Sequence, residues 1–209
     1  LRMSRGLGDV YKRQLYNGPE CGASAPDHMH FQAAGKEESL STPFFKDFLN
    51  DIIEQTDFDD VPAIVNSYAN NTFITSIGLA SILRSELIEK FENIYNILST
   101  FYGKEPLINI IAWYAIDSTK HGEDDEVVAW NCVIFLRSKH RPDCYYNQGE
   151  KGLLISPAVA EMGGVFPIIR EEDMDKLNTK EIIDIYKEIS LSPEQFETLC
   201  DELFRKDEV

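Results

Sequence analysis

The sequence contains no long apolar run and no pair of closely spaced cysteines. No stretch approaches the roughly 20 apolar residues that a membrane-spanning helix requires, and no secretory leader pattern opens the sequence, so we expect no membrane partner. The four cysteines lie far apart and include no CxxC pair; they are Cys21, Cys132, Cys144 and Cys200. Scattered thiols are typical of a reducing compartment, and they predict a cytoplasmic protein without a disulfide framework.

Positive charge is also scarce. The 209 residues carry 20 Lys and Arg against 36 Asp and Glu, which gives a net charge of −16. Nonspecific binding to nucleic acid requires a basic surface that displaces counterions, so we expect no nucleic-acid partner. An acidic protein that binds phosphorylated small molecules must concentrate positive charge locally. The positions of the few basic residues are therefore informative.

Residues 1–14, LRMSRGLGDVYKRQ, differ in composition from the rest of the chain and carry four of its 20 basic residues. The stretch Asp9–Gln14 looks like the in-frame translation of an adapter used in sequencing libraries, so we interpret residues 1–14 as a non-native scar. The alternative is a natural basic N-terminal tail. On the first interpretation the native sequence begins abruptly at Leu15, and we expect a longer protein of which this chain is the C-terminal part.

Two segments have the pattern of amphipathic helices. Ser41 and Thr42 provide N-cap hydroxyls, a proline follows in the first turn, and apolar residues recur at helical spacing, which predicts a helix over residues 43–55. Residues 81–102 have apolar side chains at steps of three or four, and Gly103 stands where a C-cap glycine is expected. This second segment is the clearest helix in the sequence.

Apolar runs rich in Ile, Val and aromatic residues predict strands. Residues 107–116 and 127–137 flank a polar loop and fit an antiparallel hairpin. Residues 28–33 and 72–77 are shorter strand candidates. Helices, hairpin and short strands together predict an α+β fold with antiparallel strands.

The C-terminal part has mixed signals. Residues 153–168 predict a short strand and a turn, whereas Thr179 and Ser192 each begin an amphipathic helical segment, the second with a capping-box pattern. We therefore divide the native chain into an α+β region over residues 15–170 and a helical segment over residues 171–209.

The stretch Asn17–Gln32, NGPECGASAPDHMHFQ, carries the strongest chemical signal. Side chains alternate along a strand, so His28, His30 and Gln32 are expected on one face, while Met29 and Phe31 pack behind. A neutral imidazole can attack phosphorus, and the N–H groups of a Gly- and Ser-containing loop can hold the oxygens. The alternatives are a half-solvated pair of histidines or two ligands of a metal site.

The string GASAPDHMHFQ behind Asn17 resembles the histidine-triad superfamily, in particular the branch with glutamine at the third motif position. That branch contains galactose-1-phosphate uridylyltransferases, diadenosine tetraphosphate phosphorylases and GDP-hexose phosphorylases. Together with FLRSKHRPD over residues 135–143 and SPAVAEMGG over residues 156–164, the chain looks closest to a gut-bacterial branch of that group. The close resemblance covers Asn17–Lys36.

The resemblance implies a role for each motif residue. The middle histidine of the family motif is the nucleophile and falls on His30. His28 would orient the loop or help to bind a structural metal, and the amide of Gln32 would hold a phosphoryl oxygen of the covalent intermediate.

The resemblance also assigns the residues around the motif. Asn17 matches a loop asparagine, while Ser24 and the backbone around Gly22 match the phosphate-contacting loop. The family often has two residues between this serine and the first histidine, whereas here three residues, 25–27, intervene. Lys36 could reach a phosphate, although a surface lysine is the alternative.

As a whole, the resemblance implies a histidine-triad-like antiparallel sheet with flanking helices, forming part of a uridylyltransferase-like protein with two related halves. The implied activity is nucleotidyl transfer through a covalent nucleotidyl-histidine. The nucleotide substrate would be a nucleotide sugar or a dinucleoside polyphosphate, and the acceptor phosphate or a sugar phosphate. The motif requires no cofactor, a divalent metal is possible, and so is a homodimer. The alternatives are a noncatalytic nucleotide-sensing module and a metal-binding protein that uses His28 and His30.

A basic cluster directly follows the second strand of the expected hairpin. It comprises Arg137, Lys139, His140 and Arg141. In so acidic a chain this cluster is the best candidate for a second anion site, because guanidinium groups pair with phosphates through two parallel hydrogen bonds. The alternative is a solvated strand end whose positive charges balance nearby carboxylates.

Overall fold

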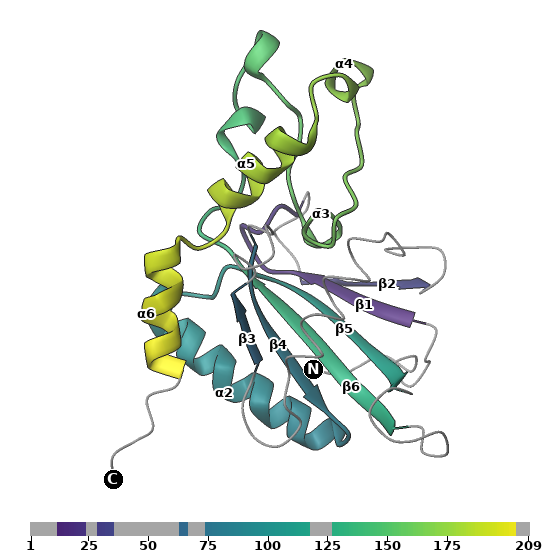
Figure 1. Cartoon of the computed structure of the whole chain (residues 1–209), viewed down its shortest axis with the longest axis vertical. Coiled ribbons are helices and arrows are strands. Elements are labelled where there is room, and N and C mark those ends of the chain that lie inside the picture. Colours follow the sequence, from purple (N-terminus) through teal and green to yellow (C-terminus); the bar gives the residue numbers. More distant parts are fainter. Residues whose placement is uncertain (1–11, 24–28, 36–62, 67–73, 118–126, 204–209) are drawn as a thin grey trace.

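The computed structural model describes residues 12–23, 29–35, 63–66, 74–117 and 127–203, and these residues form an α+β fold (Figure 1). Its centre is a six-stranded antiparallel sheet with the order β2-β1-β5-β6-β4-β3. The strands are β1 (Lys12–Asn17), β2 (Phe31–Gly35), β3 (Ala63–Asn66), β4 (Thr75–Ser81), β5 (Ile108–Asp117) and β6 (Val127–Leu136).

The helices follow or flank the strands of this sheet. They are α2 (Arg84–Tyr102), α3 (Val159–Met162), α4 (Glu171–Met174), α5 (Thr179–Ile189) and α6 (Pro193–Leu203), with short 3-10 helices η2 (Asp143–Tyr145) and η3 (Gly149–Lys151). Within the described ranges, no helix has both the length and the apolar character needed to cross a membrane. The predicted helix over residues 43–55 lies outside the described residues.

Both faces of the central strands β5 and β6 are covered. On one face, Ile134 and Leu136 of β6 pack with Leu98 of α2 and Leu199 of α6. On the other face, Val133 and Phe135 alternate with these residues and pack with α3 and α5 (Figure 1). Because both faces are buried, β5 and β6 are almost continuously apolar in sequence. The predicted hairpin is confirmed, with a register from Ile108↔Leu136 to Asp117↔Val127.

Helix α2 confirms the prediction for residues 81–102, with a later start. Ser81 is still paired in the sheet, and its hydroxyl accepts a hydrogen bond from the Leu83 N–H at 3.0 Å. Gly103 is the C-cap in the left-handed region, and its N–H donates to the Thr100 carbonyl at 3.2 Å. The expected strand over residues 72–77 is found three residues later, as β4.

Of two predictions for the C-terminal part, one is confirmed and one is wrong. The capping box of α6 is confirmed, because the Gln195 N–H donates to the Ser192 hydroxyl while the Ser192 N–H donates to the Gln195 side chain. The strand expected within residues 153–168 is wrong. The Leu154 N–H donates to the Asp173 carboxylate at 3.0 Å rather than to a neighbouring strand, and the short helix α3 follows. A local apolar run could not reveal that its partner was a side chain 19 residues away.

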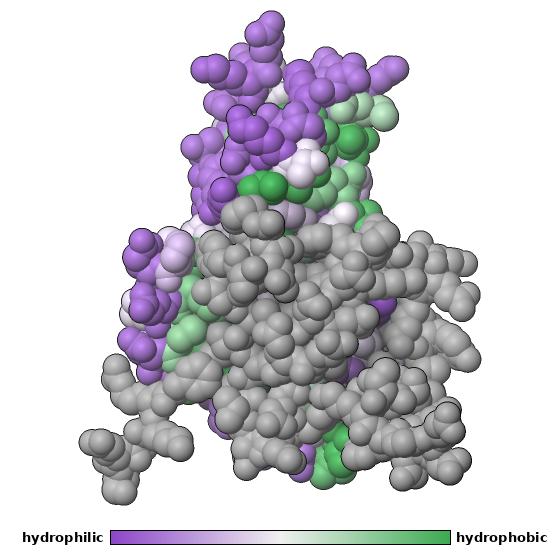
Figure 2. All heavy atoms as spheres, in the orientation of Figure 1, coloured by the Kyte–Doolittle hydropathy of each residue, from purple (hydrophilic) through white to green (hydrophobic). Residues whose placement is uncertain are grey.

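Helices α5 and α6 pack on opposite faces of the same sheet. Ile185 and Ile189 of α5 are buried with the β1–β5–β6 core, whereas Phe196 of α6 is buried against α2. The boundary at residue 171 stays an interpretation of the sequence. Figure 2 shows that the surface around η3 and α4 is mainly hydrophilic, with hydrophobic residues gathered along one side. Ile169 and Met174 are among the exposed apolar residues of this part of the chain.

Lys12, Arg13 and Gln14 of the stretch interpreted as a scar form half of β1. They pair with β2 on one side, and Arg13 and Gln14 also pair with β5 on the other. A strand ladder is formed by backbone groups, so this pairing is compatible with either origin of the residues. The interpretation of residues 1–14 stays a prediction.

Candidate functional site

The described part of the histidine motif lies at one end of the sheet. The register Tyr16↔Phe31 brings the start of β2 beside the end of β1, so His30 lies at the end of the sheet where Asn17 faces Asn109. Gln32 is opposite Leu15 and shares its face, because directly opposed residues in an antiparallel pair point the same way. Gln32 is exposed and is therefore accessible to a ligand on this edge strand.

The predicted alternation covers less of the motif than expected. The strand begins at Phe31 rather than at residue 28, and residues 24–28, including Ser24 and His28, lie outside the described residues, as does Lys36. The expectation that Met29 packs behind the motif is wrong, since its side chain is 75% exposed. Phe31 does point to the face opposite Gln32, where its ring lies 5.3 Å from the Tyr16 ring while remaining half exposed.

The loop that leaves β1 is held by three hydrogen bonds around Gly22. The Cys21 carbonyl accepts from the Asn109 side chain at 2.9 Å. The Gly22 N–H donates to Nδ1 of His140 at 3.1 Å, and the Gly22 carbonyl accepts from the Ser156 hydroxyl at 2.9 Å. The first residues of the proposed phosphate-contacting loop are therefore fixed by segments that come much later in the chain.

Gly22 is the residue that this arrangement requires. Its φ is +81°, and a Cβ atom at this position would lie 1.8 Å from the Pro157 carbonyl oxygen. Both the left-handed backbone and the close approach exclude a larger residue.

We expect Gly22→Ala to lower the free energy of unfolding by about 2 kcal/mol or more, because it adds a clash to the backbone strain. Gly103→Ala is the matched control, since Gly103 also has a positive φ but has open space around its Cβ position. Urea unfolding measures the loss of stability in both variants. The loss in Gly103→Ala reports the backbone strain alone, and the additional loss in Gly22→Ala reports the clash with Pro157. Equal losses of stability would contradict the role assigned to the Pro157 contact.

Asn17 and Asn109 connect the end of β1 to the helix α3. The Asn109 amide donates to Oδ1 of Asn17 at 2.6 Å, and the Val159 N–H donates to the same oxygen at 2.7 Å. Asn109 is fully buried. Asn17 is among the site residues predicted from the sequence, whereas Asn109 is not. Its signal in the sequence is a lone amide within the apolar run of β5.

Arg137 is fully buried beside these groups. We use the name Gly22 junction for the hydrogen-bonded set of Asn17, Cys21, Gly22, Asn109, Arg137, His140, Ser156, Pro157 and Val159. Nη1 of Arg137 donates to Oδ1 of Asn109 at 3.1 Å and to the Pro157 carbonyl, and its Nη2 donates to the His140 carbonyl at 2.8 Å. Its Nη2 and Nε also donate to the Lys139 carbonyl. Burial lowers the pKa of the guanidinium to about 10, so the group remains charged at neutral pH. Arg137, which was predicted to belong to an anion site, thus connects buried segments of the protein instead.

The other basic residues of the cluster point to different partners. Lys139 pairs with the carboxylates of Asp143 (2.8 Å) and Glu188, which raise the pKa of the lysine. His140 accepts the Gly22 N–H through Nδ1. Arg141 donates from Nε to the Ser156 hydroxyl at 2.7 Å, and its guanidinium carbon lies 4.3 Å from the centre of the Tyr145 ring. The cluster therefore does not converge on one point.

The hydrogen bond between Gly22 and His140 predicts a pH effect. Burial and the positive charges of Arg141 and Arg137 lower the pKa of His140, against an opposing effect of Glu20. The unfolded chain then takes up a proton on this histidine at a higher pH than the folded chain does. The free energy of unfolding should consequently fall as the pH decreases from 6.5 toward the lowered pKa of the folded state.

The variant His140→Gln tests this prediction, because an amide oxygen also accepts an N–H but does not titrate. Urea unfolding should show a shallower loss of stability below pH 6.5 in the variant than in the unsubstituted chain. Identical pH profiles would contradict the contribution of His140.

Glu161 and Cys21 lie in environments that stabilise their protonated forms. The Glu161 carboxylate accepts the Ala158 N–H at 2.8 Å at the start of α3, and burial raises the pKa of this carboxyl group. Burial also raises the pKa of the Cys21 thiol to about 12, which keeps it protonated and a poor nucleophile or metal ligand at neutral pH. Among the described residues, no group of three or more His, Cys, Asp and Glu side chains is arranged to hold a metal ion.

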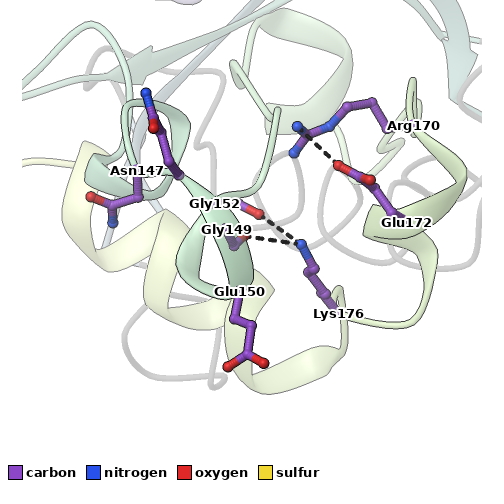
Figure 3. Close-up of a pocket in the computed structure, with 8 residues that line it drawn as sticks. Asn147, Gly149, Glu150, Gly152, Arg170, Glu172 and Lys176 are labelled. Carbon is purple, nitrogen blue, oxygen red and sulfur yellow. Dashed lines mark hydrogen bonds and ion pairs between the residues drawn. The ribbon is translucent and has the colours of Figure 1, made fainter.

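A separate hollow of about 440 Å³ lies in the C-terminal part of the fold (Figure 3). Its two basic side chains, Lys176 and Arg170, already have protein partners. Lys176 points at the carbonyls of Gly149 and Gly152, and Arg170 pairs with Glu172 at 3.2 Å. Arg170 also pairs with the buried Asp173 carboxylate at 2.8 Å. This hollow is lined by none of the residues of the Gly22 junction or of the described part of the motif.

Two family models match parts of the chain. Residues 3–35 match a domain of unknown function (DUF4922), and residues 129–207 match the C-terminal domain of a GDPGP1-like family, which is of the GDP-hexose phosphorylase type. Comparisons with curated proteins and with solved structures gave no match. The first matched stretch contains the Gly22 loop and the histidine motif, and the second contains Arg137, Arg141 and Ser156. The contacts around Gly22 therefore join the two matched stretches.

Proposed function

We propose that this chain carries the covalent-nucleotide site of a nucleotidyltransferase or phosphorylase, with His30 as the nucleophile. The observation that supports the proposal best is the junction around Gly22. It joins the stretch that contains the His-x-His-x-Gln motif to the stretch that is similar to the GDPGP1-like C-terminal domain. The substrate is a nucleotide sugar or a dinucleoside polyphosphate, and the acceptor is inorganic phosphate or a sugar phosphate.

The proposed reaction has two displacements at the α-phosphorus. In the first, a neutral nitrogen of His30 forms a bond to phosphorus while the bond to the bridging oxygen breaks, and a sugar phosphate or the other nucleotide leaves. In the second, a phosphate oxygen of the acceptor attacks the nucleotidyl-histidine and returns the electron pair to the His30 nitrogen. Each step leaves the total number of electrons on phosphorus unchanged and requires no redox partner.

The surrounding residues supply position and charge rather than acid strength. The exposed amide of Gln32 donates to a phosphoryl oxygen from the edge strand, and the family resemblance assigns the contacts to the other phosphoryl oxygens to the loop that begins at Gly22. The start of this loop is held by a chain of hydrogen bonds. Asn109 donates to the Cys21 carbonyl and to Asn17, and Arg137 donates to Asn109. Accurate placement of the reacting groups lowers the barrier to phosphoryl transfer by several kcal/mol. This effect explains why so many buried hydrogen bonds support the loop.

Intact-mass spectrometry tests the proposal. The chain is incubated separately with UDP-glucose, GDP-glucose and diadenosine tetraphosphate, and binding of each is measured in parallel. A mass gain of one nucleoside monophosphate that is labile to acid supports the covalent mechanism and identifies the base. Nucleotide binding without any adduct would favour the noncatalytic sensing module instead, and the absence of binding would reject both.

A metal-binding protein that uses His28 and His30 is the remaining alternative. Metal analysis of the purified chain distinguishes it, because stoichiometric zinc or iron that decreases in His30→Ala would favour a metal site over a nucleophile.

A further inference from the structure

Arg141 is the arginine of the basic cluster whose side chain lies beside the Gly22 loop, one hydroxyl group away from it. The Ser156 hydroxyl accepts from Nε of Arg141 at 2.7 Å and donates to the Gly22 carbonyl at 2.9 Å. One hydroxyl group therefore separates the guanidinium from the backbone of the loop.

The guanidinium is also held in orientation. It stacks on the Tyr145 ring, with its central carbon 4.3 Å from the ring centre. Tyr145 belongs to the short helix η2, whose turn is closed by the hydrogen bond from the Tyr145 N–H to the Pro142 carbonyl at 3.1 Å. A planar cation fixed at one edge by a hydroxyl and on one face by an aromatic ring loses little entropy when it binds a ligand.

Within the described part of the chain, neither Nη1 nor Nη2 of Arg141 has a hydrogen bond or an ion pair. Its neighbours differ: the donors of Arg137 are directed to protein oxygens, and Lys139 is paired with Asp143 and Glu188. The two Nη groups are the part of a guanidinium that binds phosphate through two parallel hydrogen bonds.

We propose that Arg141 binds the phosphate group that leaves as part of the sugar phosphate in the first step and enters as the acceptor in the second. The ligand is inorganic phosphate or a phosphate monoester bound through both Nη groups, next to the Gly22 loop. This inference rests on the proposed function, which requires such a phosphate. In a chain with net charge −16, a multiply charged anion is held only where positive charge is concentrated, and the buried Arg137 adds to the positive potential from behind.

Isothermal titration of the complete chain with inorganic phosphate tests the inference without requiring turnover. Arg141→Gln should weaken phosphate binding at least about tenfold, as expected for the loss of charge-assisted hydrogen bonds. Arg141→Lys retains the charge but not the two-pronged geometry and should be intermediate. Tyr145→Leu leaves Arg141 in place without its ring and should also weaken binding. Arg84→Gln, at the exposed start of α2, is the matched control and should bind phosphate normally.

Thermal unfolding of each variant establishes that it is folded at the titration temperature. Equal phosphate affinity in Arg141→Gln and the unsubstituted chain would overturn the inference, and so would the absence of saturable phosphate binding to the unsubstituted chain. Repeating the titration with glucose 1-phosphate distinguishes the sugar phosphate from free phosphate as the preferred ligand. Phosphate binding that depends on Arg141, with no nucleotidyl adduct on His30, would support a phosphate site at Arg141 but reject both the covalent function and the role of that site in it.

Discussion

Replacing His30 with alanine is expected to abolish the nucleotidyl adduct and to lower turnover by at least about 10⁴-fold, which corresponds to about 5 kcal/mol of barrier. The reason is chemical, because a methyl group cannot form the bond to phosphorus on which both displacements depend. Nucleotide affinity should change little, since the phosphate-contacting groups of the loop and of Gln32 remain. Intact-mass spectrometry measures the adduct, and a nucleotide-release assay measures turnover.

His121→Ala is the matched histidine control for this experiment, since His121 lies between β5 and β6 in the sequence and outside the proposed motif. It should form the adduct at the normal rate. An adduct in His30→Ala at the same stoichiometry would show that another residue is the nucleophile and would reject the assignment.

Replacing Arg137 with methionine is expected to lower the free energy of unfolding by about 3–5 kcal/mol. The substitution keeps much of the side-chain volume but leaves the Pro157 and His140 carbonyls and Oδ1 of Asn109 without their donor in a buried site. Since domains of this kind have unfolding free energies of about 5–15 kcal/mol, such a loss is a large fraction of the total. Urea unfolding followed by circular dichroism measures it.

Arg137→Lys should recover part of this stability, because an ammonium group retains the charge but cannot reach all of the carbonyl oxygens that the planar guanidinium contacts. Arg84→Met, at an exposed position on α2, should stay within about 0.5 kcal/mol of the unsubstituted chain. If Arg137→Met were as stable as Arg84→Met, the buried arginine would not be the element that holds the junction together.

The two arginines show how far the sequence reasoning could reach. Arg137 and Arg141 belong to the same short basic cluster, and their residue type alone made both equal candidates for an anion site. The structure separates them, because Arg137 meets Asn109 and Pro157 inside the fold whereas Arg141 lies against Ser156 and the Tyr145 ring. Asn109, Pro157 and Ser156 lie 15–28 residues from the arginine that they contact, and Tyr145 lies four residues from Arg141. Nothing local in the sequence pattern distinguishes the two arginines.

The histidine motif shows a similar limit. The alternation of His30, Phe31 and Gln32 is visible in the sequence, but the start of β2 is set by its pairing with β1. A strand with a partner on one side has few contacts to extend it, so β2 begins at Phe31 and leaves Met29 exposed. The side chain expected to pack behind the motif therefore lies in solvent.

The sequence by itself determined the elements whose formation depends on nearby residues: the helix α2 with Gly103 at its end, the capped helix α6, the β5–β6 hairpin and therefore the α+β class. These follow from apolar spacing, capping groups and turn residues within a few positions of one another. Only the tertiary structure decided that Gly22 must lack a side chain and that Asn109 and Arg137 support the loop. It also decided that the Nη groups of Arg141 have no partner among the residues that the structure describes. Burial and pairing of a polar group depend on what the fold brings to it from distant segments, and this physical difference separates the two sets of conclusions.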